Sequence, residues 1–149
     1  MMSDLEAMQA ALAEARLAGE AGEVPIGAVA VFDGAIIARG QNRVLRDLDP
    51  TAHAEIVAMR AAAGALGNYR LLGCTLFVTL EPCAMCAGAM IHARLDRLVF
   101  AATDPKAGAA GSVLSVLNHP QLNHQMQVEQ GMLEEESAEL LRSFFRERR

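Results

Sequence analysis

The stretch Glu81-Pro82-Cys83-Ala84-Met85-Cys86 lies at a predicted change from strand to helix. The apolar and β-branched residues 74–80 before it predict a strand, and its proline suits the first turn of a helix over residues 83–92. Cysteines three positions apart lie about 60° apart around a helix, so Cys83 and Cys86 can point at one ion. Zinc, which binds thiolates in tetrahedral geometry, is the expected metal.

A second stretch, Thr51-Ala52-His53-Ala54-Glu55, supplies the remaining groups of a reaction centre. Pro50 ends the preceding segment, and residues 52–65 predict a helix with His53 and Glu55 in its first turn. His53 is the expected third metal ligand. Glu55 stays free to act as a general acid and base on water at the open position of the metal, since zinc lowers the pKa of such water to about 7.

Other sulfur and imidazole groups fit this site less well. His92 lies nine residues beyond Cys83, half a turn around the predicted helix, so it is expected to face away from the ion. His119 and His124 lie in a predicted loop where their positions stay open. Cys74, at the start of an apolar strand, is expected to be a small buried residue. Three further apolar residues are expected in the core: Met85, Met90 and Ile91.

Each motif by itself also occurs in proteins of unrelated classes. Thiol redox pairs and structural zinc clips also use Cys-x-x-Cys, and most His-x-Glu pairs are incidental. Their combination at two helix starts favours an open zinc site. A structural zinc protein or an RNA-binding module would need a fourth protein ligand, and Glu55 would then have no evident use.

Length and composition predict one α/β domain covering residues 1–149. The chain is 52% hydrophobic but only 4% aromatic, which is typical of tightly packed helices on a sheet. Its three cysteines argue against a disulfide framework, and its apolar runs are too short to cross a bilayer. The N-terminal residues lack a signal-peptide pattern, so we expect a cytoplasmic protein without a membrane partner. The net charge of -5 argues against general polyanion binding but permits a local basic face.

The other predicted elements alternate between helix and strand. Ser3 and Glu6 have the spacing of a capping box at the start of a helix over residues 3–19. Residues 25–32 and 35–40 predict two antiparallel strands joined by a turn at Asp33-Gly34. The first of these strands is apolar throughout, so both of its faces are expected to be covered. The remaining elements are strands at 97–102 and 125–129 and a final helix from residue 132.

The two motifs together resemble the His-x-Glu and Pro-Cys-x-x-Cys signature of the zinc-dependent nucleoside and nucleobase deaminases. The likeness extends over almost the whole chain and is strongest to the bacterial tRNA-specific adenosine deaminases. Besides the two motifs, the stretches that carry this likeness are Glu23-Val24-Pro25-Ile26-Gly27-Ala28-Val29, Asn42-Arg43, Asn68-Tyr69-Arg70-Leu71, Lys106-Ala107-Gly108-Ala109-Ala110-Gly111-Ser112 and Phe144-Phe145-Arg146.

The resemblance implies a three-layer α/β/α fold of the cytidine deaminase type, with a five-stranded mixed sheet. It also implies a homodimer with one zinc ion per subunit that deaminates the wobble adenosine of a tRNA anticodon to inosine and releases ammonia. A deaminase of a free nucleobase or nucleoside, of the guanine or cytosine type, is the alternative that uses the same metal chemistry.

The resemblance further assigns residues to the substrate. Asn42 is expected to hydrogen-bond the base, the backbone of Ala54 to meet its polar edge, and Ile26 and Leu80 to form pocket walls. Such a pocket requires an adenosine turned out of its stack, which a flexible anticodon loop permits. The residues expected to contact that loop are Lys106, Arg43, Arg46, Phe145 and Arg146.

Overall fold

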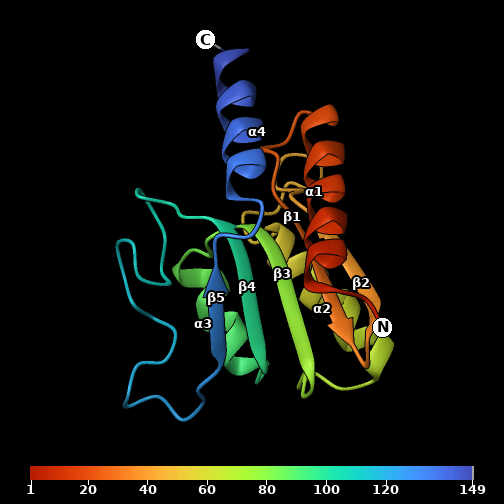
Figure 1. Cartoon of the computed structure of the whole chain (residues 1–149), viewed down its shortest axis with the longest axis vertical. Helices are drawn as coiled ribbons and strands as arrows, with labels where there is room; N and C mark the ends of the chain where they lie inside the picture. The colour runs from red at the N-terminus through yellow and green to blue at the C-terminus, as the bar shows by residue number, and fades with distance from the viewer. Residues whose placement is uncertain (149) are drawn as a thin grey trace.

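The fold is a five-stranded sheet with helices on both faces, as a computed structural model describes it for residues 1–148 (Figure 1). The elements in chain order are α1 (Asp4–Glu20), β1 (Gly27–Phe32), β2 (Ala35–Gln41), α2 (Ala54–Leu66), β3 (Cys74–Leu80), α3 (Ala84–His92), β4 (Arg97–Ala102), β5 (Gln127–Gln130) and α4 (Glu134–Arg146).

The sheet is mixed, as expected. Its strand order is β2-β1-β3-β4-β5; β1 runs antiparallel to both of its neighbours, whereas β3, β4 and β5 are parallel. The predicted hairpin is confirmed: Asp33 and Gly34 both have positive φ, which a tight two-residue turn between twisted strands requires. Strand β1 therefore lies inside the sheet.

Alternating side chains divide the core into two layers, because successive residues of a strand point to opposite faces. Val29, Phe77 and Val99 pack with Met8 and other residues of α1 on one face. On the opposite face, side chains of β1, β3 and β4 pack against α2 and α3. Figure 1 shows α1 and the blue α4 on one side of the sheet and α2 and α3 on the other. The three-layer α/β/α prediction is confirmed.

The helices begin only in part where the sequence predicts them to begin. At α1 the capping box is present, with Ser3 and Glu6 exchanging two hydrogen bonds of 3.1 Å. Helices α2 and α3 begin later than predicted, because His53 and Cys83 have extended backbones just before the first helical residue. Two of the three expected ligands are thus N-cap residues whose side chains make no cap hydrogen bond.

Helix α4 is the least enclosed helix. It starts at Glu134, after Leu133 in a left-handed conformation, and Ser137 is its one buried residue. The Ser137 hydroxyl donates to the carbonyl of Thr79 and attaches the helix to β3. No helix within residues 1–148 is both long enough and apolar enough to cross a membrane.

Helix α2 approaches the sheet so closely that only glycine fits beneath it. A Cβ atom on Gly40 would lie 2.3 Å from the carbonyl oxygen of Ala54 and 2.5 Å from the amide nitrogen of Ala58. Those atoms belong to the first turns of α2, next to His53. Gly40 therefore determines how near the start of α2 can come to β2.

We predict that Gly40→Ala lowers the free energy of unfolding by roughly 1–3 kcal/mol, because backbone atoms cannot rotate away from the added methyl group. The matched control is Gly64→Ala in α2, where an added Cβ has no neighbour within 4 Å. That change should stabilise the protein by roughly 0.5–1 kcal/mol through helix propensity. Urea unfolding of both variants tests the contrast, and equal effects would contradict it.

Candidate metal centre

Three sulfur and nitrogen ligand atoms meet where α2 and α3 begin. The Nδ1 atom of His53 lies 3.6 Å from the Sγ of Cys83 and 3.4 Å from the Sγ of Cys86. All three ligand atoms lie within 4.8 Å of one another. Within residues 1–148 these residues form the one group of three or more His, Cys, Asp or Glu side chains spaced to hold a metal ion.

The spacing fits a tetrahedral zinc ion. Bonds of about 2.3 Å to sulfur and about 2.0 Å to nitrogen place neighbouring ligand atoms about 3.5 Å apart at a tetrahedral angle. The two His53 to cysteine distances agree with that value. With three protein ligands, a coordination position is left for water, which is the arrangement of catalytic rather than structural zinc sites.

The two thiols differ in their affinity for a proton. The hydrogen bonds from Cys86 and His53 lower the pKa of Cys83 to about 3. The hydrogen bond that the Cys86 thiol makes with Cys83 raises the pKa of Cys86, and burial raises it further; a second thiolate would also repel the first. The hydrogen bond to Cys83 raises the pKa of His53. A divalent cation relieves the repulsion between two thiolates, so the charge of this donor set matches zinc.

Glu55 lies in the first turn of α2, outside the ligand group. Its side chain is 4% exposed, and burial raises its pKa to about 7. A carboxyl group with such a pKa exchanges protons readily near neutrality, which suits a general acid and base. The geometry therefore leaves one buried carboxyl group outside the group of three ligand atoms.

The predicted pocket residues lie at the same edge of the sheet. The antiparallel register that pairs Ala28 with Val78 brings Ile26 and Leu80 to this edge, and both are partly buried. The Asn42 amide nitrogen donates to the Ile26 carbonyl at 3.1 Å. Ala54 is the first residue of α2, next to His53. The four predicted pocket residues thus come from the residue before β1, the residue after β2, the last residue of β3 and the first residue of α2.

The Asn42 side chain is already oriented by the protein. Its Nδ2 donates to the carbonyl of Val24, and its Oδ1 accepts from the amide of Val44, both at 3.3 Å. A primary amide carries a second N–H and a second lone pair. Asn42 therefore has one donor and one acceptor left for a ligand.

Glu23, which the motif analysis did not single out, holds the loop that follows Asn42. Its carboxylate is 1% exposed and accepts from the amides of Leu45 and Arg46 and from the Arg46 guanidinium. Burial alone would raise the pKa of Glu23, but these hydrogen bonds outweigh it and lower the pKa. The sequence offers little indication of this role, because it shows only a single acidic residue beside apolar ones.

Glu81 plays the same part for the loop that contains Lys106. Its carboxylate is 3% exposed and accepts from the amides of Asp104, Ala110 and Ser112 and from the Ser112 hydroxyl. Burial favours the neutral acid, yet these hydrogen bonds lower the pKa of Glu81. Spacing alone could not reveal the role, because its partners lie more than twenty residues away.

The expected RNA contacts lie on the surface. Lys106 is exposed in its loop, whereas Arg43 pairs with Asp47 at 3.0 Å. On α4, Phe145 is half exposed and Arg146 pairs with Glu139 at 3.0 Å. The contacts of Phe145 and Arg146 run along α4 and join neither residue to the metal group.

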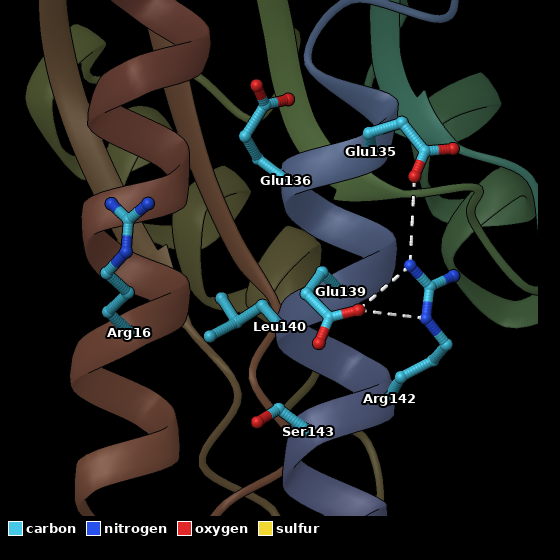
Figure 2. A pocket seen from close by; sticks show the side chains of 7 residues that line it. All are labelled: Arg16, Glu135, Glu136, Glu139, Leu140, Arg142 and Ser143. Carbon is cyan, nitrogen blue, oxygen red and sulfur yellow. Dashed lines mark hydrogen bonds and ion pairs between the residues drawn. The ribbon is translucent and has the colours of Figure 1, made fainter.

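A surface hollow between α1 and α4 is distinct from the metal group. Figure 2 shows Arg142 of α4 turned toward Glu135 and Glu139, with Arg16 of α1 across the hollow. Its lining contains no histidine or cysteine. These ion pairs make this face of α4 a solvated surface and not a second metal site.

The remaining histidines take no part in the group. His92 is exposed, as predicted. His119 accepts from the amide of Gln121, and His124 lies 2.7 Å from the carbonyl of Leu95. Cys74, Met90 and Ile91 are buried as expected. The prediction for Met85 was wrong: it is 37% exposed, because Cys86 and Met90 occupy the inward face of α3.

Comparisons with known proteins agree with this geometry. The sequence profile of the family described as MafB19-like deaminase matches residues 2–149. The tRNA-specific adenosine deaminase of Agrobacterium fabrum is 54% identical over 142 residues, which cover 95% of this chain and 93% of that protein.

Two solved structures are similar. One, described as a study of A-to-I editing by tRNA:A34 deaminases at the wobble position of transfer RNA, has a TM-score of 0.88 at 52% identity, covering 91% of this chain and 98% of the other. A guanine deaminase from Nitrosomonas europaea has a TM-score of 0.83 at 27% identity, covering 97% and 85%.

We predict that Cys83→Ala removes the bound metal and lowers the melting temperature, since two ligands hold zinc much less tightly than three. Cys74→Ala is the matched control, because that thiol is equally free but buried in β3. It should keep the metal and lose only packing. Metal analysis of the purified variants, with melting curves before and after chelation, gives the answer; a Cys83→Ala protein with full zinc content would refute the assignment.

We predict that the stability contributed by Glu23 depends on pH. Its pKa is lower in the folded protein than the ordinary value of 4.5. The contribution is therefore complete above pH 4.5 and is lost as the pH falls through the lowered folded value. Glu23→Gln should cost about 2 kcal/mol at neutral pH and progressively less in acid. Urea unfolding of both proteins across this range measures the difference, and a constant difference would contradict the prediction.

Proposed function

The chain belongs to the MafB19-like deaminase family and to the tRNA-specific adenosine deaminases, and from this premise we propose that it converts the wobble adenosine of a tRNA anticodon to inosine by hydrolysis. The observation that carries the proposal is the buried Glu55 carboxyl beside a group of three metal ligands. Ammonia is the second product. The whole chain acts as one catalytic domain.

His53, Cys83 and Cys86 would hold one zinc ion per chain. Bound there, zinc supplies water of lowered pKa, which hydrolysis at neutral pH needs. The two thiolates neutralise the charge of the ion. Because all three ligands belong to helix starts, the donor amides of α2 and α3 favour the anionic sulfur atoms.

Glu55 moves the protons of the reaction. It takes a proton from the attacking water and gives it to N1 of adenine, which makes C6 electrophilic, and the water oxygen bonds to C6. Glu55 then takes the proton of the new hydroxyl group and gives it to the amino group. The C6–N bond breaks, ammonia leaves, and the C6 carbonyl of inosine remains.

Asn42, Ala54, Ile26 and Leu80 form the proposed base pocket. The unused N–H and lone pair of Asn42 suit the polar edge of a purine, as does the backbone of Ala54. Ile26 and Leu80 provide apolar walls. The pocket is built from backbone segments that the sheet and α2 hold in place, so it is formed before the base enters.

The RNA surface consists of Lys106, Phe145 and Arg146, with Arg43 and Arg46 beside the pocket. Lysine and arginine meet phosphates, while Phe145 can stack on an unpaired base. We further propose that the enzyme acts as a homodimer in the cytoplasm, where its tRNA substrate resides. A second monomer could complete the surface that receives the anticodon loop.

We predict that the purified protein forms inosine in a tRNA whose anticodon begins with adenosine. Glu55→Gln should retain its zinc and lose at least about 100-fold in turnover, because the amide cannot carry protons. Nucleoside analysis of the treated tRNA and metal analysis of the variant provide the two readouts. Absence of inosine with zinc bound would refute the proposed function.

Guanine is the discriminating second substrate, because a guanine deaminase shares the fold at 27% identity. Efficient release of ammonia from free guanine, with tRNA left unchanged, would assign the chain to the free nucleobase class. Loss of zinc from Glu55→Gln would instead contradict the role of Glu55 as a proton carrier that does not bind the metal.

A further inference from the structure

We infer that Glu81 is a positioning residue, whose carboxylate holds the loop of residues 103–112 so that Lys106 is placed to meet RNA. The RNA contact of Lys106 rests on the proposed function. The attachment of the loop to Glu81 does not depend on that function, because it is inferred from hydrogen bonds alone.

The carboxylate binds both ends of the loop at once. Its Oε1 accepts from the Asp104 amide at 3.0 Å and from the Ser112 hydroxyl. Its Oε2 accepts from the amides of Ala110 and Ser112 at 3.0 and 3.1 Å. Four donors therefore meet one buried anion, and Lys106 lies in the segment between them. Charged acceptors form stronger hydrogen bonds than neutral ones, so this is a firm attachment.

The neighbouring backbone strengthens the same attachment. The Glu81 amide donates to the Ala102 carbonyl, and the Ala109 amide donates to the Pro82 carbonyl, both at 2.8 Å. Pro82 directly precedes the metal ligand Cys83. The two residues before the ligand thus hold the loop at its start, its middle and its end, which fixes the distance between the metal group and Lys106.

The loop sequence is fitted to this carboxylate. A Cβ atom at Gly108 would lie 2.4 Å from the Cδ atom of Glu81, so any larger residue displaces either the loop or the carboxylate. Within the loop, Asp104 caps the turn by accepting from the amides of Lys106 and Ala107 at 3.0 and 3.2 Å. Lys106 is therefore presented from a short, internally bonded segment.

Glu81→Gln tests the inference with little change of shape. In glutamine one of the two oxygens is replaced by the NH2 of a side-chain amide. That NH2 then faces a backbone N–H, so two donors oppose each other and at least one hydrogen bond is lost. We expect the KM for tRNA to rise about tenfold, with kcat changed less than about threefold and the zinc content unchanged. Glu14→Gln is the matched control, since within residues 1–148 that carboxylate bonds only the side chains of Gln41 and Arg39; it should leave KM unchanged.

A double-mutant comparison with Lys106→Ala shows whether Glu81 acts by positioning Lys106 or only by stabilising the protein. Lys106→Ala should raise the KM of the wild-type enzyme but change it much less in the Glu81→Gln background, where the lysine is already misplaced. Equal effects of Lys106→Ala in both backgrounds would overturn the inference. So would an unchanged KM in Glu81→Gln, or loss of its zinc.

Hydrogen exchange makes the test independent of the substrate. In Glu81→Gln the amides of Asp104, Ala110 and Ser112 should exchange faster, while those of α1 keep their wild-type rates. If Glu81→Gln does not fold, Gly108→Ala keeps the carboxylate and should give the same exchange pattern and rise in KM. Wild-type protein that left tRNA unconverted would refute the proposed function, whereas unchanged loop exchange would refute the role of Glu81.

Discussion

The starts of α2 and α3 must meet at one edge of the sheet, because the three ligand atoms come from two segments thirty residues apart. The order of the strands meets this requirement. Helix α2 follows β2 and helix α3 follows β3, and only β1 lies between these two strands in the sheet. His53 and Cys83 have extended backbones just before α2 and α3, so neither side chain is placed by a helical turn. The close fit of Gly40 beneath Ala54 then fixes the height of α2 above the sheet. A small displacement of either helix would separate nitrogen from sulfur, so the chemistry depends on the packing of the whole α/β/α core.

Two buried carboxylates extend this rigidity from the metal group to the loops around it. Glu23 holds the loop after Asn42, and Glu81 holds the loop that contains Lys106. Each accepts from several backbone amides that would otherwise need water, and each remains charged because those donors outweigh the cost of burial. Both loops are therefore attached to the framework that carries the candidate ligands. Glu55 is the contrasting case: burial raises its pKa to about 7, which leaves it free to change its protonation state.

Local patterns predicted the features that neighbouring residues determine. The capping box at Ser3, the turn at Asp33-Gly34 and the i, i+3 cysteine pair depend on a few adjacent positions, and the structure contains each of them. Pattern alone placed the helix starts too early, because extended residues before a helix have no distinct sequence signal when their side chains do not cap it. The exposure of Met85 was missed because α3 is apolar on most of its surface. Glu81 and Glu23 were missed because their partners come from distant loops, and a single acid carries no sign of where its donors lie.

The proposed recognition of RNA by an acidic chain has to use cations that are free of internal partners. On α4, Arg142 and Arg146 are paired with Glu135 and Glu139, and near the pocket Arg46 is held by the buried Glu23. Within residues 1–148, Lys106 forms no such ion pair. In the proposed function, phosphate contact would then fall chiefly to Lys106 and to the exposed part of Arg46. Such a surface would neutralise few phosphates, so the proposed RNA affinity should have a shallow salt dependence and the selectivity should come from the shape of the proposed pocket. On this proposal the placement of a single lysine matters more than net charge, and the buried carboxylate beneath its loop would take part in substrate choice.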